Sequence, residues 1–230
     1  MTALRKISNA LSIALLFLAL SLGAQPRDRS FIRNQITRNG ECRNVAITQY
    51  NGDLMLYGSN GYAANGCPAG LTAALNELNA KGEYIDDVQL TEGGKWLILY
   101  GNNGFRWSDI PYSLEQKIRE WNSMGEIISS VSFNDYGDWA AVSSNYVMAS
   151  DSRIQDWIAE GMRKYGTVWT TCITNDSMVV VFEEGFTFLG DIPYTLRREL
   201  SNTYINVYRL KIAGDSWFFS DGVSRYRYNM

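Results

Sequence analysis

The sequence predicts an α+β protein built from five tandem α-β-β-β repeats of about 41 residues. The tetrapeptide Asp109–Tyr112 returns as Asp191–Tyr194, 82 residues later, which is two repeat lengths. Gly82-Glu83 and Gly125-Glu126 are separated by 43 residues. We expect a signal peptide at residues 1–24 and one five-unit domain at residues 25–230. Its units are expected at about 29–68, 69–111, 112–151, 152–193 and 194–230.

The stretch Val88–Ile127 serves as the template for one unit. A short alternating strand at Val88–Leu90 is followed by an apolar strand at Lys95–Tyr100 and a mixed strand at Phe105–Ser108. A strand that is apolar throughout is expected to be buried on both of its faces. A helix is predicted to begin at Ser113 and end at Gly125.

The predicted helices carry apolar residues four positions apart, which gives each helix one buried stripe. These pairs are Leu71 and Leu75, Leu114 and Ile118, Ile154 and Ile158, and Leu196 and Leu200. The dipeptides Asn60-Gly61 and Asn103-Gly104 predict type I′ hairpin turns, which need positive φ at both central residues.

Two assemblies of the five units satisfy the pattern. A central strand buried on both faces favours a propeller-like ring, in which neighbouring units cover each other. The repeat is similar in length to that of WD-type propellers and shares their Trp-bearing strand, but it has a helix in each unit and lacks the Gly-His signature. The alternative is an open α/β solenoid, with the polar first helix (residues 27–39) as its cap.

The beginning of the chain has the features of a secretory signal peptide. Arg5 and Lys6 precede an apolar run at Leu11–Leu22, and small residues follow it. A secreted or periplasmic protein is therefore predicted, without a membrane span in the mature chain. Removal of the two basic residues changes the net charge from −3 to −5, which argues against a nucleic-acid partner.

The chain contains no histidine. This excludes Ser-His and Cys-His nucleophile pairs and most zinc sites. No calcium-loop signature is present. We expect no metal, no cofactor and no catalytic residue. The acidic residues are expected at solvated turns and strand edges, among them Asp86, Asp87, Asp135, Asp138, Glu183, Glu184, Asp215 and Asp221.

Aromatic residues recur near the third strand and the start of the helix. A binding rim is predicted from Tyr62, Phe105, Trp107, Tyr112, Phe186 and Tyr194. Rigid aromatic side chains are common where proteins contact ligands. Packing between neighbouring units is the alternative role for each of them.

The three cysteines divide into two groups. Cys42 and Cys67 occupy isoleucine positions of other units, and both lie in the first unit of an exported chain. A disulfide between them is one prediction, and two separate core thiols are the other. Cys172 is aligned with Leu90 and Phe133 and is expected to be a buried apolar residue.

These observations predict a non-enzymatic repeat protein that binds a protein or glycan ligand. A carboxylate-dependent glycoside hydrolase is an alternative from another class, because that chemistry needs no histidine. A structural component of the cell envelope is a third possibility. Two acids in a deep aromatic-lined pocket would favour the hydrolase, whereas a flat or shallow aromatic surface would favour binding.

Overall fold

A computed structural model describes residues 26–230, so the predicted signal peptide lies outside the described residues. The described helices are Ser30–Asn39 (α2), Ala69–Ala80 (α3), Tyr112–Ser123 (α4), Ser152–Tyr165 (α5) and Tyr194–Asn202 (α6). The first strands of the units are Asn44–Ile47 (β1), Ile85–Leu90 (β4), Ile128–Phe133 (β7), Val168–Ile173 (β10) and Arg209–Ala213 (β13). The second strands are Asp53–Tyr57 (β2), Trp96–Tyr100 (β5), Trp139–Ser143 (β8), Ser177–Phe182 (β11) and Ser216–Ser220 (β14). The third strands are Gly61–Asn65 (β3), Gly104–Ser108 (β6), Val147–Ala149 (β9), Gly185–Gly190 (β12) and Tyr226–Asn229 (β15).

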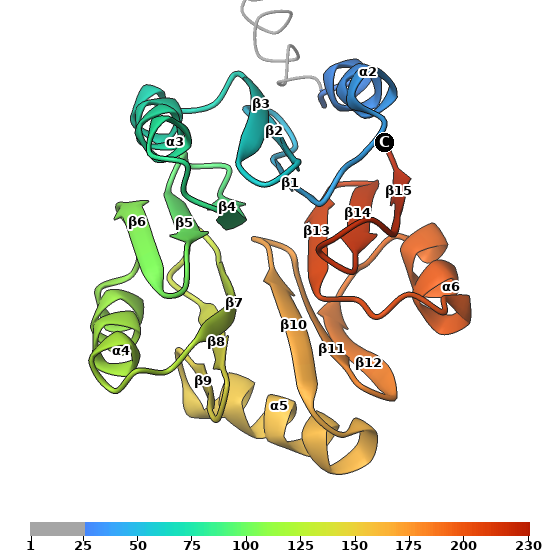
Figure 1. Ribbon diagram of the computed structural model, residues 1–230. Helices are drawn as coiled ribbons and strands as arrows, with labels where there is room; N and C mark the ends of the chain where they lie inside the picture. Colours follow the sequence, from blue (N-terminus) through green and yellow to red (C-terminus); the bar gives the residue numbers. More distant parts are fainter. Residues whose placement is uncertain (1–25) are drawn as a thin grey trace, which may run out of the picture.

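The prediction of five tandem α-β-β-β units is confirmed. Within the described residues, each unit forms its own antiparallel sheet of three strands in sequence order. Figure 1 shows the five sheets standing around a common centre, with the first strands innermost and the helices at the periphery. Each first strand contacts the first strands of the neighbouring units, and β13 also contacts β1.

The second strands are buried on both faces, as their uninterrupted apolar sequence predicts. Leu97 and Ile98 of β5 are fully buried, although they point to opposite faces of the sheet. Leu97 packs into the core around α4, and Ile98 packs into the core around α3. The third strand β6 is only half-buried and forms the outer edge of its sheet.

Each helix fills the wedge between two neighbouring sheets. Leu71 and Leu75 of α3 share one core with Leu54 of β2 and with Ile98 of β5. The apolar stripe of α3 is therefore buried by the preceding unit as well as by its own. The other described helices have the same arrangement, with one apolar core around each of them.

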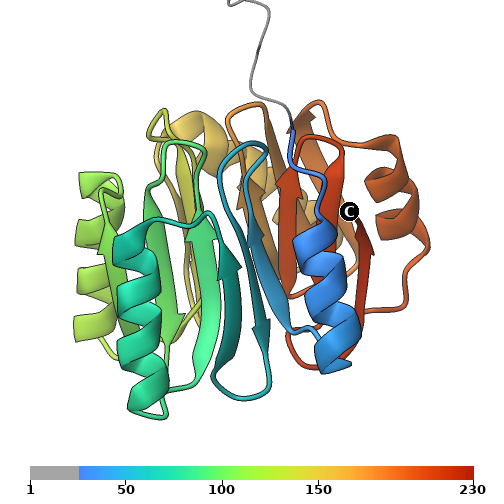
Figure 2. The same ribbon diagram turned by 90° about the horizontal axis from the view of Figure 1, so that it is seen from above.

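Helix α2 fills the wedge between the first and the last sheets. Ile32 and Ile36 pack with Met55 of β2 and with Phe218 of β14. The buried Arg29 guanidinium forms an ion pair with Asp53 (2.5 Å) and also contacts Ser216 Oγ (3.3 Å). Figure 2 shows α2 beside β15, so the two ends of the described chain lie together.

The Asn-Gly dipeptides do not form the predicted type I′ turns. In the hairpin between β5 and β6 the positive φ belongs to Gly101, and Gly104 already pairs with Tyr100 in the sheet. A Cβ atom on Gly104 would lie 2.4 Å from the Tyr100 ring. Glycine is needed there because the aromatic ring lies over the backbone, and Gly61 has the same relation to Tyr57.

In each unit a loop joins the first strand to the second. Polar side chains of this loop form hydrogen bonds with the same loop of the preceding unit. Glu92 accepts hydrogen bonds from the backbone N–H groups of Gln49 and Tyr50. Asp135 accepts bonds from Thr91 Oγ1 and from the backbone N–H of Gly93 (3.0 Å). These contacts fix the relative positions of neighbouring units at this end of the molecule. Among residues 26–230, no helix is long and apolar enough to cross a membrane.

Candidate functional site

Polar residues of the five innermost strands meet at the centre of the molecule. One such residue occupies the matching register position of each first strand, opposite the same position of its second strand. These five buried residues form the central cluster: Asn44, Asp87, Ser130, Thr170 and Arg209. Hydrogen bonds connect its members across unit boundaries, for example Asn44 to Asp87 (2.6 Å) and Ser130 to Thr170 (3.1 Å).

A buried ion pair joins the second unit to the fifth. Lys211 Nζ donates to Asp87 Oδ1 at 2.8 Å, and both side chains are less than 10 % exposed. Burial alone raises the pKa of a carboxyl group, but the nearby charges of Lys211 and Arg209 hold the pKa of Asp87 below its usual value. Arg209 also donates to Asp86 Oδ1 (2.6 Å). The expectation that Asp86 and Asp87 lie at a solvated turn was therefore wrong for Asp87, because this residue faces Arg209 and Lys211 of β13, near the other end of the chain.

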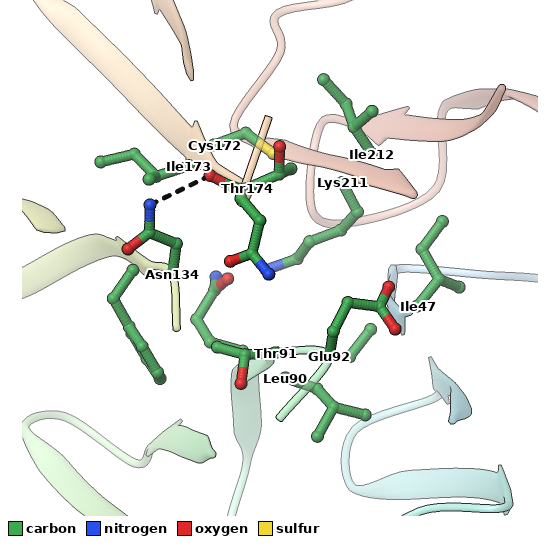
Figure 3. Close-up of a pocket in the computed structure, with 14 residues that line it drawn as sticks. Ile47, Leu90, Thr91, Glu92, Asn134, Cys172, Ile173, Thr174, Lys211 and Ile212 are labelled. Carbon is green, nitrogen blue, oxygen red and sulfur yellow. Dashed lines mark hydrogen bonds between the residues drawn. The ribbon is translucent and has the colours of Figure 1, made fainter. Parts of the chain in front are cut away.

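A small cavity lies at one end of the central cluster. Residues from the ends of all five first strands line it, and Figure 3 shows them converging on one space. The Asn134 side-chain amide donates to the Thr174 carbonyl (3.2 Å) at its edge. The cavity volume of about 50 Å³ holds a few water molecules at most. This cavity is too small for a sugar or a peptide, so it belongs to the scaffold.

A larger cavity of about 470 Å³ lies between the fourth and fifth units, at the opposite end of the strands. We call it the aromatic groove. The aromatic residues of its lining are Tyr165, Trp169 and Phe186, together with Phe182, whose ring is buried in the core around α5. The polar residues of its lining include Glu183, Glu184, Ser201 and Thr203. Its volume and its mixture of aromatic walls with a few polar groups are typical of small-ligand sites.

The aromatic groove exists because α6 ends early. Helix α4 has 12 residues and α6 has nine, although both begin at the same position of the repeat. The position occupied by the buried Leu78 in α3 and by Trp121 in α4 is Thr203 in the fifth unit, beyond the end of α6. A large apolar side chain is thus missing from this wedge, and a cavity remains.

Trp169 projects into the groove from a β-bulge. The register of β10 with β11 shifts between Val168 and Thr170, which leaves Trp169 unpaired in the ladder. The corresponding bulges of β4 and β7 carry Asp86 and Ser129. The Trp169 ring packs against Tyr208, with the ring centroids 5.2 Å apart. The matching position is Arg43, Asp86 and Ser129 in the first three units and aromatic in the last two, Trp169 and Tyr208. This change from polar to aromatic residues is a sequence signal for the site that the predicted binding rim does not include.

The aromatic residues predicted as a binding rim do not form one surface. Tyr62, Phe105, Trp107 and Phe186 are half-buried and pack against cores of different units. Trp107 stacks on Phe105 (4.8 Å). Tyr112 and Tyr194 are each 75 % exposed at the first residue of their helices. Of these six residues, the aromatic groove includes only Phe186.

The predicted Cys42–Cys67 disulfide is not formed, and all three cysteines are free. Cys42 belongs to the core around α2, whereas Cys67 packs against the core around α3 on the other side of the first sheet. Cys172 is buried as expected, but it pairs with Val179, one position away from the register of Leu90 and Phe133.

Comparison with known proteins adds no relative. No family model matches the chain, and no curated protein is similar to it. The chemistry of the central cluster and of the aromatic groove is therefore the basis for the function proposed below.

The ion pair gives a first testable prediction. Lys211→Met leaves the Asp87 carboxylate buried without its direct ion-pair partner, and we expect the free energy of unfolding to fall by about 3–5 kcal/mol. The double variant with Asp87→Asn should regain most of this loss. Urea unfolding measures both, with Lys81→Met as an exposed control, for which we expect about 1 kcal/mol or less. Equal stability of Lys211→Met and the unmodified protein would contradict the prediction.

The same pair predicts a loss of stability in acid. The folded pKa of Asp87 lies below its unfolded value of about 3.9. Its contribution is therefore complete above that pH and is lost as the pH falls through the folded pKa. Asp87→Asn should flatten the acid side of the stability curve.

The thiols give a third prediction. Burial raises the pKa of Cys42 to about 12 and the pKa of Cys67 to about 11, so neither forms much thiolate at neutral pH. We expect slow alkylation by iodoacetamide in the native protein and rapid alkylation in urea. Peptide mapping by mass spectrometry without reduction should find three free thiols. A Cys42–Cys67 crosslinked peptide would refute this.

Proposed function

We propose that the five units close into a propeller-like ring and that this ring is a rigid scaffold for ligand binding. Contact between β13 and β1 supports closure, as does the core in which α2 packs against both β2 and β14. Arg29, which contacts Asp53 and Ser216, adds a polar link between the same two units. An open solenoid would leave its first and last units apart.

Closure predicts a compact particle in solution. A globular chain of the size of the described domain has a radius of gyration of about 17 Å. We expect small-angle X-ray scattering of the mature protein to give a value near this. A markedly larger radius, with an elongated distance distribution, would favour the open stack.

We propose further that the protein binds a glycan, without chemical conversion, in the aromatic groove. The observation that carries this proposal is the placement of Trp169 and Phe186 beside Glu183, Glu184 and Thr203 in one cavity of about 470 Å³. A sugar ring has a flat face of C–H groups, which packs on aromatic rings, and a rim of hydroxyls. Carboxylates accept strong hydrogen bonds from such hydroxyls. A secreted or periplasmic location, as the N-terminal sequence predicts, would expose the groove to extracellular or envelope glycans.

Loss of the Trp169 ring should weaken glycan binding. In a glycan array of neutral and acidic oligosaccharides we expect selective binding, and for the bound sugars Trp169→Ala should reduce affinity roughly 30-fold, equivalent to about 2 kcal/mol. Tyr194→Ala is the matched control, because Tyr194 is 75 % exposed at the other end of α6. The absence of binding to any oligosaccharide would refute the proposal. Loss of binding in Tyr194→Ala alone would place the site at the helix starts.

Glycoside hydrolysis is the second candidate, because two carboxylates line the same aromatic groove. Glu183 and Glu184 are adjacent in the chain and exposed at the turn between β11 and β12. Hydrolysis by two carboxyl groups requires them on either side of one glycosidic bond, at about 5–10 Å from each other. Product analysis of bound oligosaccharides distinguishes the two functions. Cleavage that is lost in Glu183→Gln or Glu184→Gln would establish the hydrolase.

A further inference from the structure

A second groove lies beside the aromatic groove, on the fifth unit. Its volume is about 430 Å³, and its lining consists of Tyr204, Ile205 and the segment Ser224–Arg227. We call it the basic groove, because its charged residues are Arg225 and Arg227. Both arginines are exposed. Ile205 lines the basic groove and the aromatic groove alike, so the two are adjacent.

The two arginines point to the same side of the last hairpin. Residues two apart in an extended chain share a face, and the intervening Tyr226 packs on the other face against Phe218 (6.0 Å). Arg227 is oriented by contacts with the Tyr204 hydroxyl (3.4 Å) and the Tyr226 carbonyl (3.3 Å). Within residues 26–230, neither guanidinium forms a salt bridge.

The acidic residue of this hairpin, Asp221, uses its carboxylate to stabilise the turn. The Asp221 carboxylate accepts backbone N–H bonds from Val223, Ser224 and Arg225, at 2.8–3.0 Å. Burial opposes ionisation of Asp221, but these three bonds, together with the nearby charge of Arg225, lower the pKa of the group. Asp221 lies close enough to interact with the charge of Arg225 but forms no salt bridge with it, so the N–H groups of both guanidinium groups can still donate to an anion.

The charge of the fifth unit is unusual for this chain. Residues 194–230 include six basic and three acidic side chains, a net charge of +3, whereas the whole chain has a net charge of −3. Arg209 and Lys211 are engaged with Asp86 and Asp87 in the interior. Without these two, four basic and three acidic side chains remain in residues 194–230, a net charge of +1. Arg225 and Arg227 are exposed and form no salt bridge within residues 26–230, so they are a local positive site on a negative protein, and such a site attracts anions.

We propose that the basic groove binds the carboxylate or sulfate groups of an anionic polysaccharide whose neutral sugar faces occupy the aromatic groove. The proposal rests on the glycan-binding function proposed above and specifies the class of ligand. Glu183 and Glu184 line the aromatic groove and are absent from the basic groove. Sugar hydroxyls face these glutamates, and the acidic substituents face the arginines, which bind such groups with two parallel N–H···O bonds.

The test compares each acidic oligosaccharide with its neutral isostere. The probes are oligogalacturonate against its methyl ester, and chondroitin sulfate oligomers against the desulfated, carboxyl-esterified form. Calorimetric titration of the mature protein should give roughly tenfold tighter binding of at least one acidic form. This preference should weaken at high salt, because exposed charges are screened. The oligogalacturonate pair tests carboxylate recognition alone. Desulfated chondroitin that keeps its carboxylates is a third probe, and it separates sulfate from carboxylate recognition in the chondroitin series.

The double variant Arg225→Gln/Arg227→Gln should lose the preference for acidic ligands and keep the affinity for the neutral forms. Arg153→Gln is the matched control, since Arg153 is 78 % exposed on the fourth unit. Equal binding of acidic and neutral forms by the unmodified protein would overturn the inference and leave glycan binding intact. An acid preference that persists in the double variant would also overturn it. Failure of every oligosaccharide to bind would refute the proposed function itself.

Discussion

The burial of each helix between two sheets is the constraint on which the rest of the structure depends. A three-stranded sheet with an apolar second strand cannot cover both of its faces, and a short amphipathic helix is unstable alone. The core around α3 combines Leu54 from the first unit with Leu75 and Ile98 from the second. Each unit therefore completes the core of its neighbour, and no unit has a complete core by itself.

This dependence explains why the sequence predicts some features well and others poorly. The helices and second strands were predicted because the spacing of their apolar residues depends directly on which faces are buried. Leu114 and Ile118 lie on the one buried face of a helix, and Leu97 and Ile98 lie on opposite faces of a strand that is buried on both. The roles of Asp87 and Lys211 were missed because a contact between residues 124 positions apart has no local pattern. The turn at Gly104 was mispredicted because the Tyr100 ring, rather than backbone φ, requires the glycine.

Residues that differ between matching positions of the repeat have two different roles in this structure. An unusual residue at a repeat position does not by itself indicate a ligand site, because the central cluster has a different residue in every unit. Asp87, Arg209 and Asn44 differ because they complement one another at the centre. Thr203 and Trp169 do not complement each other in this way: Thr203 Oγ1 accepts a bond from the Ile205 N–H, and the Trp169 ring packs on Tyr208. Both residues line the aromatic groove. Unusual residues that satisfy each other's charges and hydrogen bonds belong to the scaffold. Unusual residues that do not are better candidates for ligand binding.

The position of α2 also has a consequence for the order of folding. Its partners Met55 and Phe218 come from opposite ends of the sequence, and the contact from Arg29 to Ser216 spans 187 positions. Such distant contacts make loop closure slow relative to local pairing. As the chain emerges, α2 has only half of its apolar partners until the fifth sheet arrives. In a nascent or truncated chain, Ile32 and Ile36 therefore remain exposed as a hydrophobic patch that chaperones and proteases can recognise. Burial of this patch marks the point at which the fold is complete.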